Sequence, residues 1–172
     1  MRWDADIPRV DRFNRIKWMD LNAPAPIADN PQVKAVFPSV PVLIHLAQPQ
    51  NLSSIEGFFD AYKAHGGNWD ISAFSSYGSG SATISGIISN INTYKSRYGK
   101  PVMQVEFGGR VDRASRTETD LESYITGMKN IGGLGVFYWE PEVYSPFSSY
   151  NMGAWDATSR EPTVALSGFL NA

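Results

Sequence analysis

Residues 101–107 read Pro-Val-Met-Gln-Val-Glu-Phe, a short, mostly apolar run that ends on a carboxylate and an aromatic ring. Near-continuous apolar runs of this length are typical of strands buried on both faces of a parallel sheet. Three further runs have the same character, at residues 41–47, 69–75 and 134–139. The four runs begin about 30 residues apart, the size of one βα unit. We therefore predict four strands at these positions.

Helical periodicity separates the predicted strands. Apolar residues recur at i, i+3, i+4 and i+7 in three segments that begin at Ile55, Ile84 and Leu121, and this spacing places them on one face of a helix. A weaker helical pattern over residues 164–170 closes a fourth unit. The chain thus alternates between strands and helices from residue 41 onward.

The helix boundaries carry their own signals. Ser53 followed by Glu56, and Thr119 followed by Glu122, have the spacing of a capping box at a helix start. Glycines at 66–67, 99 and 132–133 follow the predicted helices and indicate their ends.

Residues 1–40 differ from the rest. Five prolines interrupt every candidate helix there, and only residues 32–37 have the pattern of a helical turn. We predict an irregular N-terminal arm over residues 1–40 and an α/β domain over residues 41–172.

Four βα units fit two architectures. A doubly wound sheet is one, but Gly78-Ser79-Gly80 after the second strand lacks the remaining spacing of a dinucleotide-binding loop, and no Walker lysine is present. The other is a partial (β/α)8 barrel. A complete barrel takes about 250 residues, so a chain of 172 residues holds roughly four of the eight units.

Composition excludes several classes of function. The chain has no cysteine, which rules out disulfide frameworks and thiolate metal sites, and its formal net charge is −2, which disfavours nucleic-acid binding. No apolar run approaches the roughly 20 residues of a membrane span, so we expect no membrane partner. Zero cysteine fits several compartments, and localisation stays open.

Polar and aromatic residues cluster where the predicted strands end. Active residues of parallel α/β folds lie at the carboxyl ends of strands. The candidates there are His45, Gln48, Tyr77, Glu106, Trp139 and Glu140.

Glu106 carries the strongest chemical signal. A charged carboxylate at the end of a buried strand is costly without partners, which favours a functional role. The alternative is a structural ion pair with Arg110, the nearest arginine in sequence. Trp139 offers a flat ring to a sugar, but a tryptophan at a strand end also simply fills a barrel. No His, Asp or Glu set has metal-ligand spacing, so we expect neither a metal nor a cofactor.

Four motifs resemble one enzyme family. They are His45-Leu46-Ala47-Gln48-Pro49, the strand of residues 70–77, the segment Tyr98-Gly99-Lys100-Pro101 leading into Glu106, and Gly133-Leu134-Gly135-Val136-Phe137-Tyr138-Trp139-Glu140-Pro141. In this order they resemble glycoside hydrolase family 53, the arabinogalactan endo-β-1,4-galactanases. The resemblance implies a (β/α)8 barrel of which this chain holds the C-terminal half, strands 5 to 8.

The resemblance also implies roles. Glu106 matches the nucleophile at the end of strand 7, and Trp139 matches the tryptophan that floors the subsite of the reacting sugar. His45 and Tyr77 match positions that line the cleft. Two departures affect the cleft: Ser75-Ser76-Tyr77-Gly78 replaces a strand 6 motif with a second tyrosine and a proline, and Phe107 replaces a threonine after the nucleophile.

The family's acid/base glutamate, which follows strand 4, has no counterpart here. The first glutamate of the chain is Glu56, in a helix of a later unit. A retaining glycosidase needs two carboxyl groups, so we expect the chain to be inactive on galactan by itself. Two alternatives remain: a non-catalytic carbohydrate-binding half barrel, and a retaining glycosidase completed by a second copy or by the other barrel half, unless Glu140 or Glu142 substitutes. Members of the family are usually secreted or periplasmic.

Overall fold

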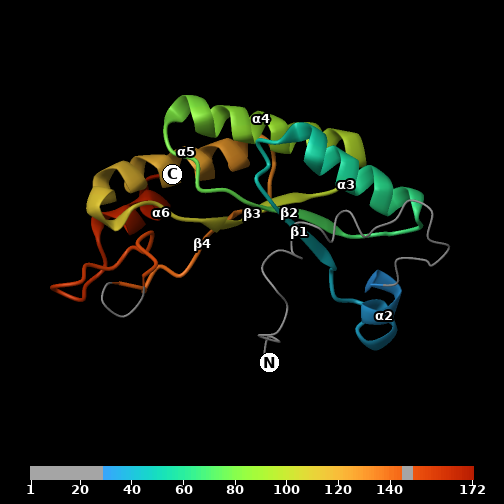
Figure 1. Cartoon of the computed structure of the whole chain (residues 1–172), viewed down its shortest axis with the longest axis horizontal. Coiled ribbons are helices and arrows are strands. Elements are labelled where there is room, and N and C mark those ends of the chain that lie inside the picture. Colours follow the sequence, from blue (N-terminus) through green and yellow to red (C-terminus); the bar gives the residue numbers. More distant parts are fainter. Residues whose placement is uncertain (1–28, 145–148) are drawn as a thin grey trace. The chain divides into compact units, whose positions relative to one another are not determined.

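The computed structural model describes residues 29–144 and 149–172 (Figure 1). The elements follow in the order α2 (Asp29–Val36), β1 (Leu43–Ala47), α3 (Leu52–Ala64), β2 (Ile71–Ser75), α4 (Ser81–Tyr98), β3 (Val102–Phe107), η1 (Val111–Arg113), α5 (Ala114–Asn130), β4 (Val136–Tyr138), η2 (Val164–Ser167) and α6 (Gly168–Asn171). All four predicted strands and all three predicted helices are confirmed. No helix among the described residues is long and apolar enough to cross a membrane.

The chain divides into two compact units, residues 1–40 with 53–68 and residues 41–52 with 69–172. The first unit contains α2 and most of α3. Helix α2 begins three residues before the predicted turn and ends at Val36. Residues 1–28, the greater part of the predicted irregular arm, lie outside the described residues. On α3 the predicted apolar face is buried at Ile55, Phe59 and Tyr62.

The second unit contains a four-stranded parallel sheet in the order β1-β2-β3-β4. Neighbours in sequence are neighbours in the sheet, and α4 and α5 cover the same face of it (Figure 1). A doubly wound sheet reverses its strand order and places helices on both faces. The sequential order without a reversal is that of consecutive barrel units, so the α/β fold predicted from the sequence is confirmed.

Side chains from the sheet and its covering helices form the core of this unit. Isoleucines 84, 87, 88 and 91 of α4 are buried, as are Leu121, Tyr124 and Met128 of α5. Aromatic rings join the layers, because Phe74 packs against Tyr94 with ring centres 5.2 Å apart and Phe107 packs against Tyr124 at the same distance. Burial of each such ring contributes about 2–3 kcal/mol.

Glycine ends helix α4 as predicted. Gly99 has φ +62°, and its N–H donates to the Lys95 carbonyl. Gly66 and Gly132 likewise have positive φ, a conformation that only glycine adopts readily.

The predicted capping box at Thr119 is wrong. Helix α5 begins at Ala114, five residues earlier, and the Thr119 hydroxyl donates within the helix to the Ser115 carbonyl at 3.2 Å. Helix α3 begins at Leu52, one residue before Ser53. Residues at i and i+3 share a face anywhere in a helix, so the motif spacing alone does not locate a helix start.

The strand ends are not in simple register. The pairing shifts between Phe74 and Ser75 of β2 and again between Gln104 and Phe107 of β3. Such bulges bend a strand and re-aim the side chains beside it. Both shifts lie at the carboxyl ends of the strands, where the candidate residues are.

Candidate active site

Three of the predicted residues meet at the carboxyl edge of the sheet. His45 comes from β1, Tyr77 follows β2, and Glu106 is the penultimate residue of β3. The Tyr77 hydroxyl donates to Glu106 Oε2 at 2.9 Å, and His45 Nδ1 lies 3.9 Å from Glu106 Oε1. The second distance is longer than a hydrogen bond and makes an ion pair only when the histidine is protonated.

Glu106 is half-buried and is not part of the structural ion pair considered from the sequence. Its side chain is 21% exposed. Arg110 instead binds Asp112, through Nε at 2.8 Å and Nη2 at 2.7 Å. The Glu106 carboxylate is thus held by a neutral hydroxyl donor.

Tyr77 stays protonated over the usual pH range. Burial, together with the hydrogen bond to Glu106, raises the pKa of Tyr77 well above its ordinary value of 10.0. The protonated hydroxyl can therefore donate to Glu106.

Gln104 connects the ends of β2 and β3. Its side chain is fully buried, and its amide nitrogen donates to the carbonyl oxygens of Ser76 at 3.2 Å and Glu106 at 2.7 Å. These two bonds bridge strands whose ladder is broken by the register shift. The only sequence signal for this role is a polar side chain inside the apolar run of residues 101–107.

In the part of the chain that the structure describes, the other predicted residues make no side-chain hydrogen bond or ion pair with Glu106. The Trp139 side chain is 42% exposed, and the backbone N–H of Trp139 donates to the Phe107 carbonyl at 2.8 Å, which places this residue directly beside the end of β3. The backbone N–H of Gln48 donates to the Ser75 carbonyl at 3.0 Å. Gln48 and Tyr77 both line a cavity of about 440 Å³. Glu140 is exposed.

Backbone strain coincides with two of these positions. Gln48 has φ +62° and Glu140 has φ +44°, a region that non-glycine residues rarely adopt. Such strain persists where surrounding structure imposes it, and it clusters at functional sites. The positive φ angles favour a functional role for Gln48 and Glu140, the two candidates for which the sequence offers the weakest argument.

Residues 27–169 match the family model for glycosyl hydrolase family 53. This chain belongs to that family. The match covers all four strands, and the resemblance drawn from the sequence motifs is confirmed at the level of the family.

The related proteins are considerably longer than this family 53 chain. An uncharacterized protein from the bgaB 5′ region of Niallia circulans is 24% identical over an alignment of 135 residues, and the match covers 63% of this chain and 37% of that protein. The catalytic domain of a family 53 enzyme from Ignisphaera aggregans superposes with a TM-score of 0.69 at 18% identity, covering 83% of this chain and 49% of that one.

Two further structures share the fold. A fungal β-1,4-galactanase gives a TM-score of 0.57 at 20% identity, with 76% of this chain and 47% of that one covered. A family 128 endo-β-1,3-glucanase from Amycolatopsis mediterranei gives 0.61 at 12% identity, with 83% and 62% covered. The chain therefore spans about half the length of these barrels.

Tyr150 is a neighbour of the candidate site in this family 53 chain that the sequence did not indicate. Tyr150 lies beside Gly108, because a Cβ built on that glycine would approach the Tyr150 hydroxyl at 2.8 Å and Tyr77 Cε1 at 3.0 Å. Burial raises the pKa of Tyr150 to about 12, and the charges of Glu140 and Glu106 add to this effect. Tyr150 follows β4 by many residues in an irregular segment, and no sequence pattern identifies such a neighbour.

Residues 29–144 and 149–172 contain no group of three or more His, Asp or Glu side chains arranged to hold a metal ion. Glu106, Tyr77 and His45 bring a carboxylate, a phenol and an imidazole together at the candidate site.

Proposed function

We propose that this family 53 chain contributes the nucleophile side of a site that cleaves β-1,4-galactan with retention of configuration, and that Glu106 is the nucleophile. The observation that carries the proposal is the placement of Glu106, half-buried at the carboxyl end of β3 and hydrogen-bonded to Tyr77. In barrels, catalytic residues come from the carboxyl ends of strands.

Each neighbour has a role in this proposal. The Tyr77 hydroxyl holds Glu106 Oε2, which leaves Oε1 to attack the anomeric carbon as the glycosidic C–O bond breaks. Trp139 supplies an exposed ring for the apolar face of the sugar. His45, Gln48 and Glu140 supply polar atoms for the sugar hydroxyls.

The second carboxyl group of a retaining site lies about 5 Å from the nucleophile and protonates the leaving oxygen. The family resemblance places it after a strand that precedes those of this chain, and the first glutamate of the sequence is Glu56. We propose that a second copy or a separate barrel half supplies this group. Support comes from the edge of the sheet at β4, where the apolar side chains of Leu134, which precedes the strand, and Phe137, within it, are 53% and 57% exposed.

Hydrolysis of polymeric β-1,4-galactan, with molar mass measured by light scattering on the same sample, tests this proposal. A monomer of 19.0 kDa is expected to release no product. Cleavage by a homogeneous monomer would contradict the proposal that the acid/base comes from outside this chain. In that case, Glu140→Gln would show whether Glu140 acts as the acid/base. Cleavage that survives Glu106→Gln would contradict the assignment of the nucleophile.

A second candidate function is sugar binding without turnover, favoured by the exposed aromatic side chains of Trp139 and Tyr77. Titration with β-1,4-galactotetraose separates the two functions. If the chain only binds sugar, Trp139→Ala weakens binding. Glu106→Gln then leaves both the binding and the reactivity toward activated glycosides unchanged, because no step uses the carboxylate.

A further inference from the structure

A second cavity adjoins the proposed sugar site and is lined by three arginines. Its volume is about 340 Å³, and its wall includes Arg110, Arg113 and Arg116 as well as Tyr77. A volume near 300 Å³ is at the lower end of the range for small-ligand sites. Glu106 does not line this cavity, but Tyr77 does, so the cavity and the proposed nucleophile share one side chain.

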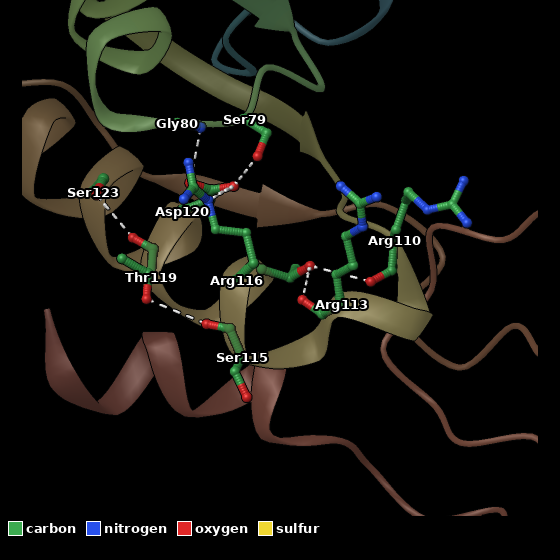
Figure 2. Close-up of polar contacts among 10 residues, drawn as sticks. Ser79, Gly80, Arg110, Arg113, Ser115, Arg116, Thr119, Asp120 and Ser123 are labelled. Atoms are coloured by element: carbon green, nitrogen blue, oxygen red, sulfur yellow. Dashed lines mark hydrogen bonds and ion pairs between the residues drawn. The ribbon is translucent and has the colours of Figure 1, made fainter.

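Two of the three arginines are already paired. Arg116 Nε lies 3.1 Å from Asp120 Oδ1, and Asp120 is buried and also accepts from Ser79 and from the Gly80 N–H (Figure 2). Arg110 is bound by Asp112, which lies outside the cavity wall. Each of these guanidinium groups is therefore largely neutralised locally.

Of the three arginines that line the cavity, Arg113 has no carboxylate partner among the described residues. In the described part of the chain, no ion pair is recorded for its guanidinium, although its charge does act on the Asp112 carboxylate. Figure 2 shows the Arg110 and Arg113 side chains extending in the same direction from the η1 turn, whereas Arg116 reaches toward Gly80 and Asp120. With Asp112 and Asp120 counted, the cluster keeps one positive charge in excess.

The start of α5 adds to the positive potential. Arg113 is the N-cap residue of this 17-residue helix and makes no side-chain cap hydrogen bond. The first turn of a helix carries a partial positive charge and free N–H donors. Arg116 and Thr117 of that turn both line the cavity.

We propose that this arginine cavity is a subsite for the carboxylate of an acidic sugar, a uronosyl residue attached to the galactan. The inference rests on the proposed function, because Tyr77 connects the cavity to the site where the neutral chain would lie. A planar guanidinium pairs with a carboxylate through two parallel hydrogen bonds, which an ammonium group cannot do. The whole chain has a formal net charge of −2, so the local charge of the cavity is opposite in sign to that of the protein as a whole.

The test compares three ligands by calorimetric titration at low salt. They are β-1,4-galactotetraose, the same tetraose bearing one uronosyl branch, and the methyl ester of that branch, which keeps its shape and removes its charge. The acidic ligand is expected to bind about fivefold more tightly than its ester, as for a charge pair that is partly exposed. Raising the salt concentration should reduce this ratio.

Matched variants separate a specific site from general charge. Arg113→Gln should abolish the ratio between acid and ester, and Arg113→Lys should restore only part of it. Arg97→Gln removes one positive charge in the last turn of α4, at the opposite edge of the sheet, and should leave the ratio unchanged.

The results distinguish this inference from the proposed function. A ratio of one, a ratio that Arg113→Gln does not change, or full competition by inorganic phosphate alone would overturn the uronosyl subsite. Absence of galactotetraose binding would contradict the proposed function, while acid binding that depends on Arg113 would still uphold the subsite. Absence of binding by all three ligands would overturn both.

Discussion

The position of the Glu106 carboxylate depends on single neighbouring residues. Tyr77 supplies the hydroxyl donor, and Gly108 makes room for Tyr77 because any Cβ there would lie 3.0 Å from the Tyr77 ring. The geometry of the carboxylate therefore depends on a glycine that makes no hydrogen bond to it.

Gly108→Ala is expected to lower the free energy of unfolding by about 1–3 kcal/mol, the usual effect of overpacking a tight site. The added methyl group would meet the Tyr150 hydroxyl, the Tyr77 ring and the Met152 carbonyl oxygen. Urea denaturation measures the change.

Gly86→Ala is the matched control for that substitution. Gly86 lies within α4 and has no heavy atom within 4 Å of its would-be Cβ, so alanine should stabilise the helix by about 0.5–1 kcal/mol. Equal effects of the two substitutions would contradict the packing described around Gly108.

The titration of Tyr150 gives a pH-dependent prediction. Burial raises the pKa of Tyr150 to about 12, above the ordinary value of 10.0. The folded state keeps the phenolic proton where the unfolded state has lost it, so the stabilising contribution is complete below pH 10 and declines between pH 10 and pH 12.

Carbon-13 NMR of the tyrosine ring carbons measures this titration, with Tyr150→Phe assigning the signal. The Tyr150 resonance should move near pH 12, and the free energy of unfolding of Tyr150→Phe should decline less steeply above pH 10. A folded-state midpoint at pH 10 would contradict the burial described for this side chain.

At the scale of elements, the apolar runs predicted the strands and the helical spacing of apolar residues predicted the main helices. Strands β1 to β4 lie within the predicted runs at 41–47, 69–75, 101–107 and 134–139. Strand β4 is shorter than its run, although the backbone N–H groups of Leu134 and Trp139 still donate to the carbonyls of Val102 and Phe107 on β3. Each run reflects the burial of its own strand, so it can be recognised from the local sequence alone.

The local motifs and the site were less predictable. Thr119 with Glu122 has capping-box spacing but lies inside α5. Glu106, Tyr77 and His45 were predictable because strand ends of a parallel sheet converge, whereas Tyr150 and the arginine cavity depend on how irregular segments fold back. The register shifts that orient Glu106 and Gln104 have no sequence signature.

Asp120 connects two elements and provides a prediction at this scale. Its buried carboxylate on α5 accepts from Ser79, Gly80 and Arg116, which joins α5 to the loop between β2 and α4. Asp120→Ala should lower the free energy of unfolding by about 2–4 kcal/mol, because it removes three hydrogen bonds that a buried, charged acceptor makes.

The adjacent Thr119→Ala serves as the control for Asp120→Ala. Its hydroxyl is exposed and bonds only within the helix, so the change should stay within about 0.5 kcal/mol. A loss at Asp120 as small as that at Thr119 would show that the loop is not held by this carboxylate.

At the scale of the whole molecule, the chain is a family 53 sheet of four sequential strands with one proposed carboxylate of a two-carboxylate mechanism. The relatives that share the fold are about twice as long. General-acid help is needed to expel a sugar hydroxyl, but not to expel a good leaving group such as fluoride. A nucleophile without its acid/base should therefore still react with an activated glycoside.

Intact-protein mass spectrometry after incubation with a 2-deoxy-2-fluoro-β-galactosyl fluoride tests the central claim most directly. Glu106 attacks the anomeric carbon, fluoride leaves with the bonding electron pair, and the ester that forms persists because the 2-fluoro group slows its hydrolysis. The account predicts one added fluorogalactosyl group on a peptide containing Glu106, and none in Glu106→Gln. An unlabelled wild-type protein, or a label on another residue, would contradict it.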